Sequence, residues 1–315
     1  MDFLIVTNRR DLTSDYIVRE LRRRNLRYRR LNTETIGLSS LEFDPLRGSF
    51  ELEQEGRKLR LQDVKAAYFR RPQPPELRPG IAQQAETYCR NEWFALLKSL
   101  YLFLEERWLS HPNAILLAED KPRQLRLAKS LGFRVPGTLI SNAPRAVEDF
   151  VATGTVVGKP LRHALFDDGD EQKVMFTTRL AEVPDGNAVS AAPVIYQEEI
   201  RKRIDVRATV VADRVFAAGI HSQETDETAV DWRRGSNPKL KHEILGLPED
   251  VRQACVGFVR GQNLRFGAID LVLDEEGNYW FLECNPNGQW AWIENRTGLP
   301  IASAIVDELE EIARQ

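Results

Sequence analysis

Two carboxylates and an amide near the C-terminus are the side chains whose types and spacing most clearly suggest chemistry. Asp270 and Glu283 each interrupt an apolar, strand-like run, and the short turn at 276–278 predicts that the two runs pair as antiparallel strands. If Asp274 lies opposite Tyr279, then Asp270 lies opposite Glu283, with their Cβ atoms about 4.5–5.5 Å apart. Because burying two like charges is costly, the pair requires a nearby cation.

Asn285 extends this set, since it follows Glu283 by two residues and therefore shares its face of an extended strand. Two carboxylates and an amide oxygen form the all-oxygen set that suits Mg2+, which in turn bridges substrate phosphates. The alternative is a carboxylate pair neutralised by nearby arginines. We favour the metal site, because an Asp paired with Glu-x-Asn across a hairpin serves no packing purpose.

Two lysines could supply positive charge to a phosphorylated ligand. Lys159 ends the apolar run 155–158, and Lys121 opens a helix-like segment. The string 154–159 resembles a phosphate loop only superficially, because its spacing is one residue short and Pro160 replaces Ser or Thr. A lysine at a strand end can still neutralise a phosphate as a point charge, although either lysine taken alone is more often a surface residue.

The segment 195–207 offers a third group of polar residues. An apolar strand ends at 198–200, and the next strand carries Asp205 and Arg207 on one face. An acceptor for sugar hydroxyls could therefore lie beside a donor for phosphate oxygens. As an isolated pair, Asp205 and Arg207 are more often an ordinary salt bridge.

Composition narrows the class of protein. The chain has 315 residues, 42% of them hydrophobic, and a formal net charge of −3, which is typical of a globular protein of about two domains rather than a polycation that binds nucleic acid. No run of about 18 uncharged apolar residues predicts a membrane span. The three distant cysteines (Cys89, Cys255 and Cys284) fit a reducing, cytoplasmic compartment and exclude a disulfide scaffold.

The absence of two sequence motifs argues against further classes of enzyme. No Gly-x-Ser-x-Gly turn is present, and no Gly-x-Gly-x-x-Gly follows the first strand-like run, which argues against serine hydrolases and nicotinamide-dependent dehydrogenases. Arginine supplies 34 of the 44 basic residues, and for most of these genome composition is a sufficient reason. We expect the densest group to be the solvated end of a helix; it comprises Arg19, Arg22, Arg23, Arg24, Arg27, Arg29 and Arg30.

Apolar periodicity predicts alternating strands and helices in the first third, and therefore an open α/β layer. The elements expected there are strands at 2–7, 26–31 and 66–69, a hairpin around 55–56, and helices at 12–25 and 81–109. After a boundary near 111–113 we expect helices at 119–131, 144–152, 249–261 and 301–312, a mobile loop at 167–170, and strands at 138–140, 155–159, 172–177, 194–200, 204–212, 214–220, 266–273 and 279–284.

Taken in chain order, these pieces resemble the ATP-grasp fold. The pattern comprises a lysine before a central domain, a strand-borne Gly-Lys, the Gln-Glu-Glu-Ile hinge at 197–200, Asp-x-Arg at 205–207, and Asp and Glu-x-Asn on neighbouring strands. Within that superfamily the chain resembles the microviridin-type (graspetide) ligases that macrocyclise ribosomal peptides. The residues that carry this resemblance are Tyr68-Phe-Arg-Arg-Pro72, the VPGT unit after Lys121, Asp231-Trp-Arg233, and Leu282-Glu-Cys-Asn-Pro-Asn-Gly-Gln-Trp-Ala-Trp-Ile-Glu294.

The resemblance implies a mixed α/β (α+β) fold in three parts. These are an N-terminal pre-ATP-grasp open α/β domain at 1–115, a central ATP-grasp subdomain that acts as a lid at 116–193, and a C-terminal ATP-grasp subdomain with the metal site at 194–315. A loop containing Gly169 would close over the nucleotide. Cys284 stands where an aliphatic residue is expected, and we predict that it faces away from the metal.

The resemblance also implies residue roles. They are the magnesium ligands and catalytic residues Asp270, Glu283 and Asn285, the ATP contacts Lys121, Lys159, Gln197, Glu198, Glu199, Ile200 and Asp205, the catalytic acyl-phosphate contact Arg207, and the substrate-carboxylate contacts Arg70, Arg71 and Arg233. The cofactors would be ATP and Mg2+. Phosphoryl transfer requires charge neutralisation and in-line positioning more than a protein nucleophile, which agrees with these residue types.

The implied activity is a carboxylate–amine or carboxylate–alcohol ligase. ATP would phosphorylate Asp or Glu side chains of a ribosomal precursor peptide, with a leader and an acidic, Thr-rich core, and Thr, Ser or Lys side chains would then close ω-ester or ω-amide rings. Alternatives are a RimK-like or glutathione-synthetase-like ligase of free amino acids or a protein terminus, a non-catalytic nucleotide-binding module, and an Arg-rich nucleic-acid binder. We expect no nucleic-acid or membrane partner and leave a homodimer open.

Overall fold

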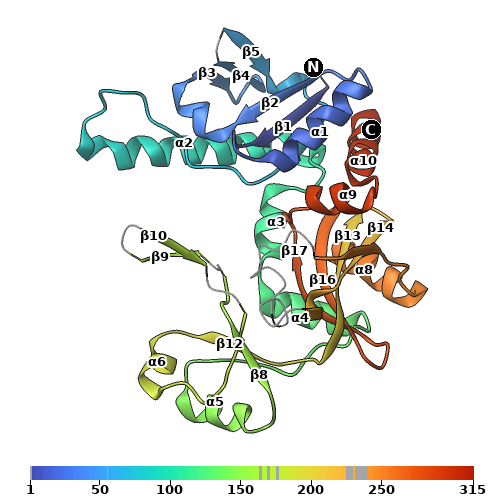
Figure 1. Ribbon diagram of the computed structural model, residues 1–315. Coiled ribbons are helices and arrows are strands. Elements are labelled where there is room, and N and C mark those ends of the chain that lie inside the picture. The colour runs from blue at the N-terminus through green and yellow to red at the C-terminus, as the bar shows by residue number, and fades with distance from the viewer. Residues whose placement is uncertain are drawn as a thin grey trace.

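The computed structural model describes residues 2–54, 56–162, 165–168, 171–174, 177–224, 230 and 240–315, and of 165–168 and 171–174 it describes the backbone. The predicted substrate contact Arg233 and the predicted loop residue Gly169 lie outside the described residues. Within the described part, several sheets are covered by helices (Figure 1), which confirms the predicted mixed α/β class.

The N-terminal strands form a parallel sheet in the order β2-β1-β6. Its strands are β1 (Phe3–Thr7), β2 (Tyr28–Asn32) and β6 (Ala66–Phe69), and its helices are α1 (Leu12–Arg23) and α2 (Gln83–Leu104). Phe3 and Ile5 of β1 pack in the core cluster that includes α1 residues, whereas Leu4 and Val6 pack with α2 residues. Because β1 is covered on both faces, the whole strand is apolar, as parallel strands usually are.

A small antiparallel sheet, β3-β4-β5, lies beside this layer (Figure 1). Its strands are β3 (Ser40–Asp44), β4 (Ser49–Gln54) and β5 (Arg57–Arg60), and short 3-10 turns precede and follow it at η1 (Thr33–Leu38) and η2 (Leu61–Asp63). The pairing of β4 with β5 confirms the predicted hairpin. β3 was not predicted; the ring of Phe43 stacks on that of Phe50 at 4.6 Å between centroids, which holds β3 against β4.

Helical segments connect the N-terminal layer to the rest of the chain. They are η3 (Glu105–Arg107), α3 (Pro112–Ala118) and α4 (Lys121–Ser130). The predicted helix 81–109 ends earlier, at Leu104, because Glu105 adopts a left-handed backbone with φ of 39°. Helix α3 was not predicted, although Pro112 at its first turn and the His111 cap, whose Nδ1 accepts from the backbone of Asn113, are typical of a helix start.

The central part of the chain is a four-stranded sheet in the order β11-β8-β12-β7. Its elements are β7 (Thr138–Ser141), α5 (Pro144–Val151), β8 (Val156–Lys159), β11 (Thr178–Arg179), α6 (Gly186–Ala191) and β12 (Val194–Glu198). A separate hairpin is formed by β9 (Leu165–Asp168) and β10 (Glu171–Val174). The prediction of a loop at 167–170 was therefore wrong for 167 and 168, which belong to β9.

The C-terminal part is a five-stranded antiparallel sheet in the order β15-β14-β13-β16-β17. Its elements are β13 (Lys202–Val211), β14 (Arg214–Ile220), η4 (Ser222–Glu224), β15 (His242–Ile244), α8 (Glu249–Gly261), β16 (Phe266–Asp274), β17 (Tyr279–Asn285), α9 (Ala291–Thr297) and α10 (Ile301–Arg314). Ile269 and Leu271 of β16 pack in the core cluster that contains α4 and α8 residues, while Ala268 packs with α9 and α10 residues.

Two observations concern the environment of the chain. No helix in the described ranges is long and apolar enough to cross a membrane. All three cysteines are free, as their wide spacing predicted.

Candidate nucleotide and catalytic site

Three neighbouring strands place three charged side chains in a row across the C-terminal sheet. Arg207 of β13 lies opposite Asp270 of β16, and Asp270 lies opposite Glu283 of β17. Arg207 Nε is 3.1 Å from Asp270 Oδ1, and both side chains are largely buried. The predicted juxtaposition of Asp270 and Glu283 is therefore confirmed, and Arg207 compensates the acidic pair from the neighbouring strand.

The register that led to this prediction was nevertheless wrong at the turn. Tyr279 lies opposite Leu273 rather than Asp274, and an extra residue in β17, Leu282, shifts the register by one before Glu283. Asp274 instead closes the turn, because its carboxylate accepts from Trp280 Nε1 at 2.8 Å. That hydrogen bond lowers the pKa of Asp274 to about 2.

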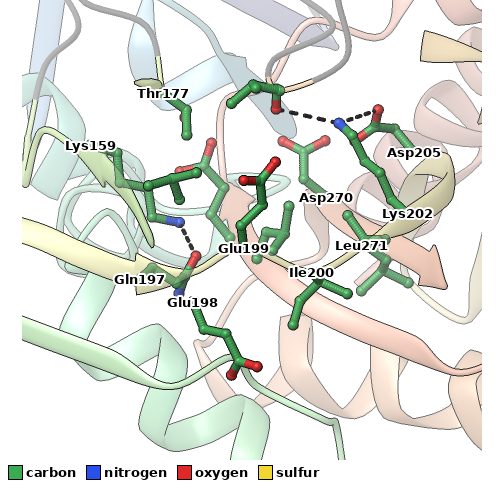
Figure 2. A pocket seen from close by; sticks show the side chains of 15 residues that line it. Lys159, Thr177, Gln197, Glu198, Glu199, Ile200, Lys202, Asp205, Asp270 and Leu271 are labelled. Atoms are coloured by element: carbon green, nitrogen blue, oxygen red, sulfur yellow. Dashed lines mark hydrogen bonds and ion pairs between the residues drawn. The ribbon is translucent and has the colours of Figure 1, made fainter. Parts of the chain in front are cut away.

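A pocket lies between the central and C-terminal sheets (Figure 2). It gathers eight of the predicted site residues: Lys159, Gln197, Glu198, Glu199, Ile200, Asp205, Asp270 and Glu283. The other lining residues, which the sequence did not point to, are Val157, Thr177, Lys202, Val230, Leu271, Val272 and Leu282. Charged groups and apolar patches thus share one cavity, as in sites that hold both the phosphates and the base of a nucleotide.

Lys159 enters the pocket from the end of β8. Its buried ammonium donates to Gln197 Oε1 of the adjacent strand β12 at 2.7 Å (Figure 2). Gln197 Nε2 in turn donates to Thr138 Oγ1 of β7 at 2.8 Å. This chain of hydrogen bonds fixes the side-chain orientation of Gln197 and holds the lysine at the pocket wall.

The chain leaves the central sheet at the predicted hinge. Both hinge carboxylates have partners outside the pocket: Glu198 Oε2 accepts from the backbone of Gly137 at 3.2 Å, and Glu199 accepts from the Arg179 guanidinium at 2.5 and 2.6 Å. Their side chains are thus engaged by β11 and the segment before β7. The backbone N–H groups of Glu198 and Glu199 are engaged as well, by the carbonyls of Gly137 and Thr155 at 2.9 Å each.

Asp205 lies at the opposite wall, beside a lysine that sequence analysis missed. Lys202 Nζ donates to both carboxylate oxygens of Asp205, at 2.8 and 2.9 Å, and Ser222 Oγ also donates to it. Lys202 is nine-tenths buried. Lys202 faces the pocket because the β13–β16 register shifts between Lys202 and Ile204, an irregularity that residue spacing does not reveal.

Lys121 and Asn285 border the acidic pair without lining the pocket. Lys121 Nζ is 3.4 Å from Glu283 Oε2 and donates to the backbone oxygen of Pro160 at 2.9 Å. Asn285 follows Glu283 on the same face of β17, and its Oδ1 accepts from the backbone of Asn287 at 3.0 Å. The lysine therefore contacts both the acidic strand and the segment that follows Lys159.

Gln124 on α4, another residue that the sequence did not single out, holds the acidic strand in place. Its side-chain amide donates to the Cys284 carbonyl at 2.7 Å and accepts from the Cys284 backbone N–H at 2.8 Å. The Cys284 thiol points into the core on the α4 and α8 side, so the prediction that it faces away from the acidic pair is confirmed. Burial raises the pKa of this thiol.

The arginines predicted to bind a substrate carboxylate are placed differently from one another. Arg70 is fully buried; it pairs with Asp11 at 3.0 Å and donates to the carbonyls of Asn287 and Gly288 at 3.0 and 2.7 Å. In this position Arg70 orients the loop after Asn285, and its expected contact with a substrate carboxylate stays a prediction. Arg71 is exposed, with a left-handed φ of 42°.

The arrangement of sheets and pocket residues matches a known family. Residues 118–309 match the model of the RimK-like ATP-grasp domain, which is more than half of the chain. The chain belongs to the RimK-like ATP-grasp family. It is an ATP-dependent ligase, and the predicted ATP-grasp fold is confirmed.

Curated relatives of this ATP-grasp ligase include probable alpha-L-glutamate ligases. The Xanthomonas oryzae pv. oryzae protein is 25% identical over 210 residues, which cover 64% of this chain and 68% of the relative. The Haemophilus influenzae protein is 26% identical over 212 residues, covering 64% and 66% respectively. The likeness to these ligases therefore covers about two thirds of each chain.

Solved structures match over nearly the full length. The Microcystis aeruginosa macrocyclase MdnC, bound with the precursor peptide MdnA, is 26% identical with a TM-score of 0.85, covering 99% of this chain and 100% of that one. The macrocyclase MdnB of the same organism is 27% identical with a TM-score of 0.79, covering 98% of each. A Chryseobacterium gregarium RiPP-associated ATP-grasp ligase in complex with ADP and peptides shares the fold, with 24% identity, a TM-score of 0.89, and 98% and 96% covered.

ATP-grasp ligases use ATP and Mg2+, and the donor set of this chain fits the metal. In the described residues no cluster of three His, Cys, Asp or Glu side chains could hold a metal. The candidate set is instead two opposed carboxylates, Asp270 and Glu283, with the amide of Asn285 on the same face. Such a set suits Mg2+, which completes its coordination with waters and substrate phosphates.

Proposed function

We propose that this ATP-grasp ligase macrocyclises a ribosomal precursor peptide. The observation that carries the proposal is the extent of the structural match. The structural likeness to MdnC, a macrocyclase bound with its precursor peptide, spans 99% of this chain, and the sequence match to the glutamate ligases spans 64%. The N-terminal layer is therefore shared with the peptide macrocyclases and lies outside the family match that begins at residue 118.

The proposed reaction has two steps, phosphorylation of a carboxylate and closure of the ring. The γ-phosphoryl group of ATP passes to an Asp or Glu carboxylate oxygen of the peptide, which gives ADP and an acyl phosphate. A Thr or Ser hydroxyl, or a Lys amine, of the same peptide then attacks the acyl carbon, expels phosphate and loses its proton. The product is an ω-ester or an ω-amide ring, and neither step requires a nucleophile from the protein.

The pocket supports the following division of roles. Asp270, Glu283 and Asn285 would hold Mg2+, which would supply positive charge to the phosphoryl group in transfer. Arg207 lies beside Asp270 and offers positive charge to the acyl phosphate. Lys159 and Lys202 approach from opposite walls (Figure 2), where two ammonium groups would flank the polyphosphate.

The remaining ATP contacts follow from the hinge and the pocket rim. We assign adenine to the hinge at 198–200, which lines the pocket together with the apolar Val272 and Leu282. Asp205 would accept from ribose hydroxyls with the lone pairs that Lys202 and Ser222 leave. Lys121 would contact phosphates from beside Glu283, and Arg71 and Arg233 remain the proposed contacts to the substrate carboxylate.

The fold supports a three-part division for this chemistry. The N-terminal domain would span 1–115, the lid subdomain 116–193 and the metal-bearing subdomain 194–315. The pocket between the central and C-terminal sheets is lined by residues of the last two parts. A location in the cytoplasm, where ATP and reduced cysteines are found, fits the proposal.

Mass spectrometry tests the proposal. Purified protein is incubated with ATP, Mg2+ and a peptide that carries Glu or Asp together with Thr or Lys; the candidate peptide is the product of a short neighbouring reading frame. We expect ADP release and the loss of one water per ring. ADP release without loss of water from any such peptide would contradict the macrocyclisation.

A second function is favoured by the glutamate-ligase relatives. In that case the acyl phosphate forms on a peptide or protein terminus and free glutamate supplies the amine. ADP release that depends on free glutamate, with a gain in mass of the acceptor rather than loss of water, would identify this activity.

A further inference from the structure

A second hollow lies on the N-terminal layer, and its lining residues differ in type from those of the ATP pocket. We call it the arginine cleft. It is lined by Arg9, Asp15, Val18, Arg19, Arg22, Tyr28, Arg29, Arg30, Asn32, Thr35, Gln54 and Arg57. Among these described residues six are arginines and one, Asp15, is acidic, although the whole chain carries a net charge of −3. The cleft is therefore a local concentration of positive charge.

The cleft follows the edge of a sheet. Its residues come from the loop after β1, from α1, from the edge strand β2, and from the β4–β5 hairpin. The dense arginine group was expected to be a solvated helix end. Arg19 and Arg22 are exposed on α1 as expected, whereas Arg29 and Arg30 lie on strand β2, and all four line the cleft. Their guanidinium groups come from separate elements, so only an extended ligand could contact them all.

Internal acids neutralise only part of this charge. Arg30 pairs with Asp15, and Arg19 is 3.7 Å from Glu294. Arg22 Nε donates to the neutral Tyr28 hydroxyl at 2.7 Å. In the described part of the chain, the guanidinium groups of Arg9 and Arg57 have no hydrogen-bond or ion-pair partner.

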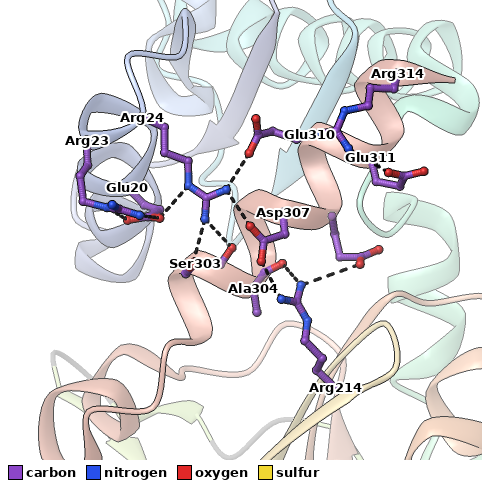
Figure 3. Close-up of polar contacts among 11 residues, drawn as sticks. Glu20, Arg23, Arg24, Arg214, Ser303, Ala304, Asp307, Glu310, Glu311 and Arg314 are labelled. Carbon is purple, nitrogen blue, oxygen red and sulfur yellow. Dashed lines mark hydrogen bonds and ion pairs between the residues drawn. The ribbon is translucent and has the colours of Figure 1, made fainter.

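Two neighbouring arginines that do not line the cleft form ion pairs with acidic residues of helices. Arg24 donates to Asp307 at 2.7 Å and Glu310 at 2.6 Å of α10, and Arg23 pairs with Glu20 (Figure 3). These two belong to the same sequence run as the cleft arginines. The run therefore contains a structural pair, Arg23 and Arg24, that is matched by acids, whereas Arg22, which lines the cleft, donates to the Tyr28 hydroxyl.

The chemistry of the cleft favours carboxylates over nucleic acid. A guanidinium fork matches a carboxylate with two parallel hydrogen bonds. Binding to single-stranded nucleic acid normally requires aromatic rings on which bases stack. Tyr28 is the one aromatic residue in the described lining, and the Arg22 guanidinium lies 5.8 Å from its ring centroid.

The cleft is also positioned to serve the catalytic site. Arg9 and Asn32 lie at the carboxyl ends of the parallel strands β1 and β2. Arg70 follows β6 at the same edge and contacts the loop at Asn287 and Gly288, just beyond Asn285. A peptide lying in the cleft would therefore leave the N-terminal layer at the edge that faces the acidic strand.

We propose that the arginine cleft binds an acidic stretch of the peptide substrate, separate from the carboxylate that reacts. This inference rests on the proposed function for the identity of its ligand. The cleft holds the peptide by several guanidinium–carboxylate contacts, and it raises the local concentration of the reacting side chain at the pocket.

Fluorescence anisotropy tests the binding without catalysis. The probe is a short labelled peptide of alternating Glu and Ser, compared with its Gln-for-Glu analogue and a single-stranded oligonucleotide of equal charge. We compare the wild-type protein, the double variant Arg22→Gln/Arg57→Gln, and the control Arg47→Gln/Arg314→Gln, whose arginines are exposed elsewhere. Each exposed guanidinium–carboxylate contact changes affinity by a factor of about two to five.

We expect the cleft variant to bind the Glu peptide about tenfold more weakly, the control to match the wild type, and added salt to weaken binding. Equal binding by the cleft and control variants would overturn the proposal, as would tighter binding of the oligonucleotide than of the peptide. Peptide binding by the cleft without any ring formation would refute the proposed function alone. Ring formation with an unchanged KM for peptide in the cleft variant would refute the cleft alone.

Discussion

The Arg70 guanidinium donates to the carbonyl of Gly288 at 2.7 Å, although the two residues are 218 positions apart. The same side chain is fully buried and pairs with Asp11, which also accepts from Thr7 and Ser14. One arginine of the N-terminal layer therefore fixes the loop that follows the acidic strand. We therefore expect catalysis in the C-terminal part to depend on this residue of the N-terminal part.

We expect Arg70→Gln to lower the free energy of unfolding by about 3 kcal/mol, because breaking a buried ion pair leaves Asp11 uncompensated. Urea denaturation followed by circular dichroism measures the change. Arg71→Gln, at the exposed neighbouring position, serves as the control and should change stability by less than about 0.5 kcal/mol. Equal stability of the Arg70 variant and the wild type would show that the buried pair contributes nothing net.

Glu283→Gln should reduce ADP formation by about 100-fold or more, because it removes one of the two opposed carboxylates that would hold Mg2+. The variant should remain folded, since Lys121 can still contact the amide oxygen. Glu276→Gln, in the turn of the same hairpin, is the matched control and should retain its rate. Turnover like that of the wild type in the Glu283 variant would refute the metal assignment.

Lys202→Met should raise the KM for ATP by about tenfold, which corresponds to about 1.4 kcal/mol. The substitution removes an ammonium from the pocket and leaves Asp205, a buried carboxylate, without its bidentate partner. Steady-state kinetics at varied ATP measure the effect. Lys241→Met, at an exposed lysine beside Glu243, should leave the KM for ATP unchanged; an equal rise in both variants would exclude a specific role for Lys202.

The lowered pKa of Glu20 predicts how the free energy of unfolding changes at acidic pH. Hydrogen bonds from Arg23 and Arg24 lower its pKa to about 2 from an ordinary value near 4.5 (Figure 3). A carboxylate with a depressed pKa stabilises the folded state fully above its unfolded pKa, so this contribution is lost as pH falls from about 4.5 to about 2. We expect it to be about 1 kcal/mol after solvent screening.

Urea midpoints of the wild type and Glu20→Gln should therefore differ at pH 6 and converge toward pH 2, where the glutamate becomes protonated. Glu311→Gln, which removes an exposed partner of Arg314, is the control. A difference between Glu20→Gln and the wild type that stays constant over this range would show that the lowered pKa has no part in it.

Much of the site could be predicted from sequence because it lies on regular strands. Asp270 and Glu283 stand in apolar runs joined by a short turn, so antiparallel pairing brought them together. The bulge at Leu282 could not be foreseen, since no residue type or spacing in the sequence marks it. An error of one residue at the turn was cancelled by this bulge.

The residues that sequence analysis misplaced depend on contacts between distant segments. Arg70 follows a strand and precedes Arg71 and a proline, a context that looks exposed, yet a loop more than 200 residues away buries it. Lys202 faces the pocket through a local irregularity in β13. Gln124 has no motif at all, because its importance comes from the backbone of Cys284 on another element.

Lys121 is held close to β17, because Gln124 on the same helix forms two hydrogen bonds with the backbone of that strand. Its ammonium also donates to the carbonyl of Pro160, the residue that follows β8 of the central sheet. If the central and C-terminal sheets separated for nucleotide exchange, the bond to Pro160 would break, whereas the contact of Lys121 with Glu283 could persist. Lys121 thus links the two sheets like a latch, and loss of its hydrogen bond to Pro160 would leave its ammonium available to the incoming phosphates.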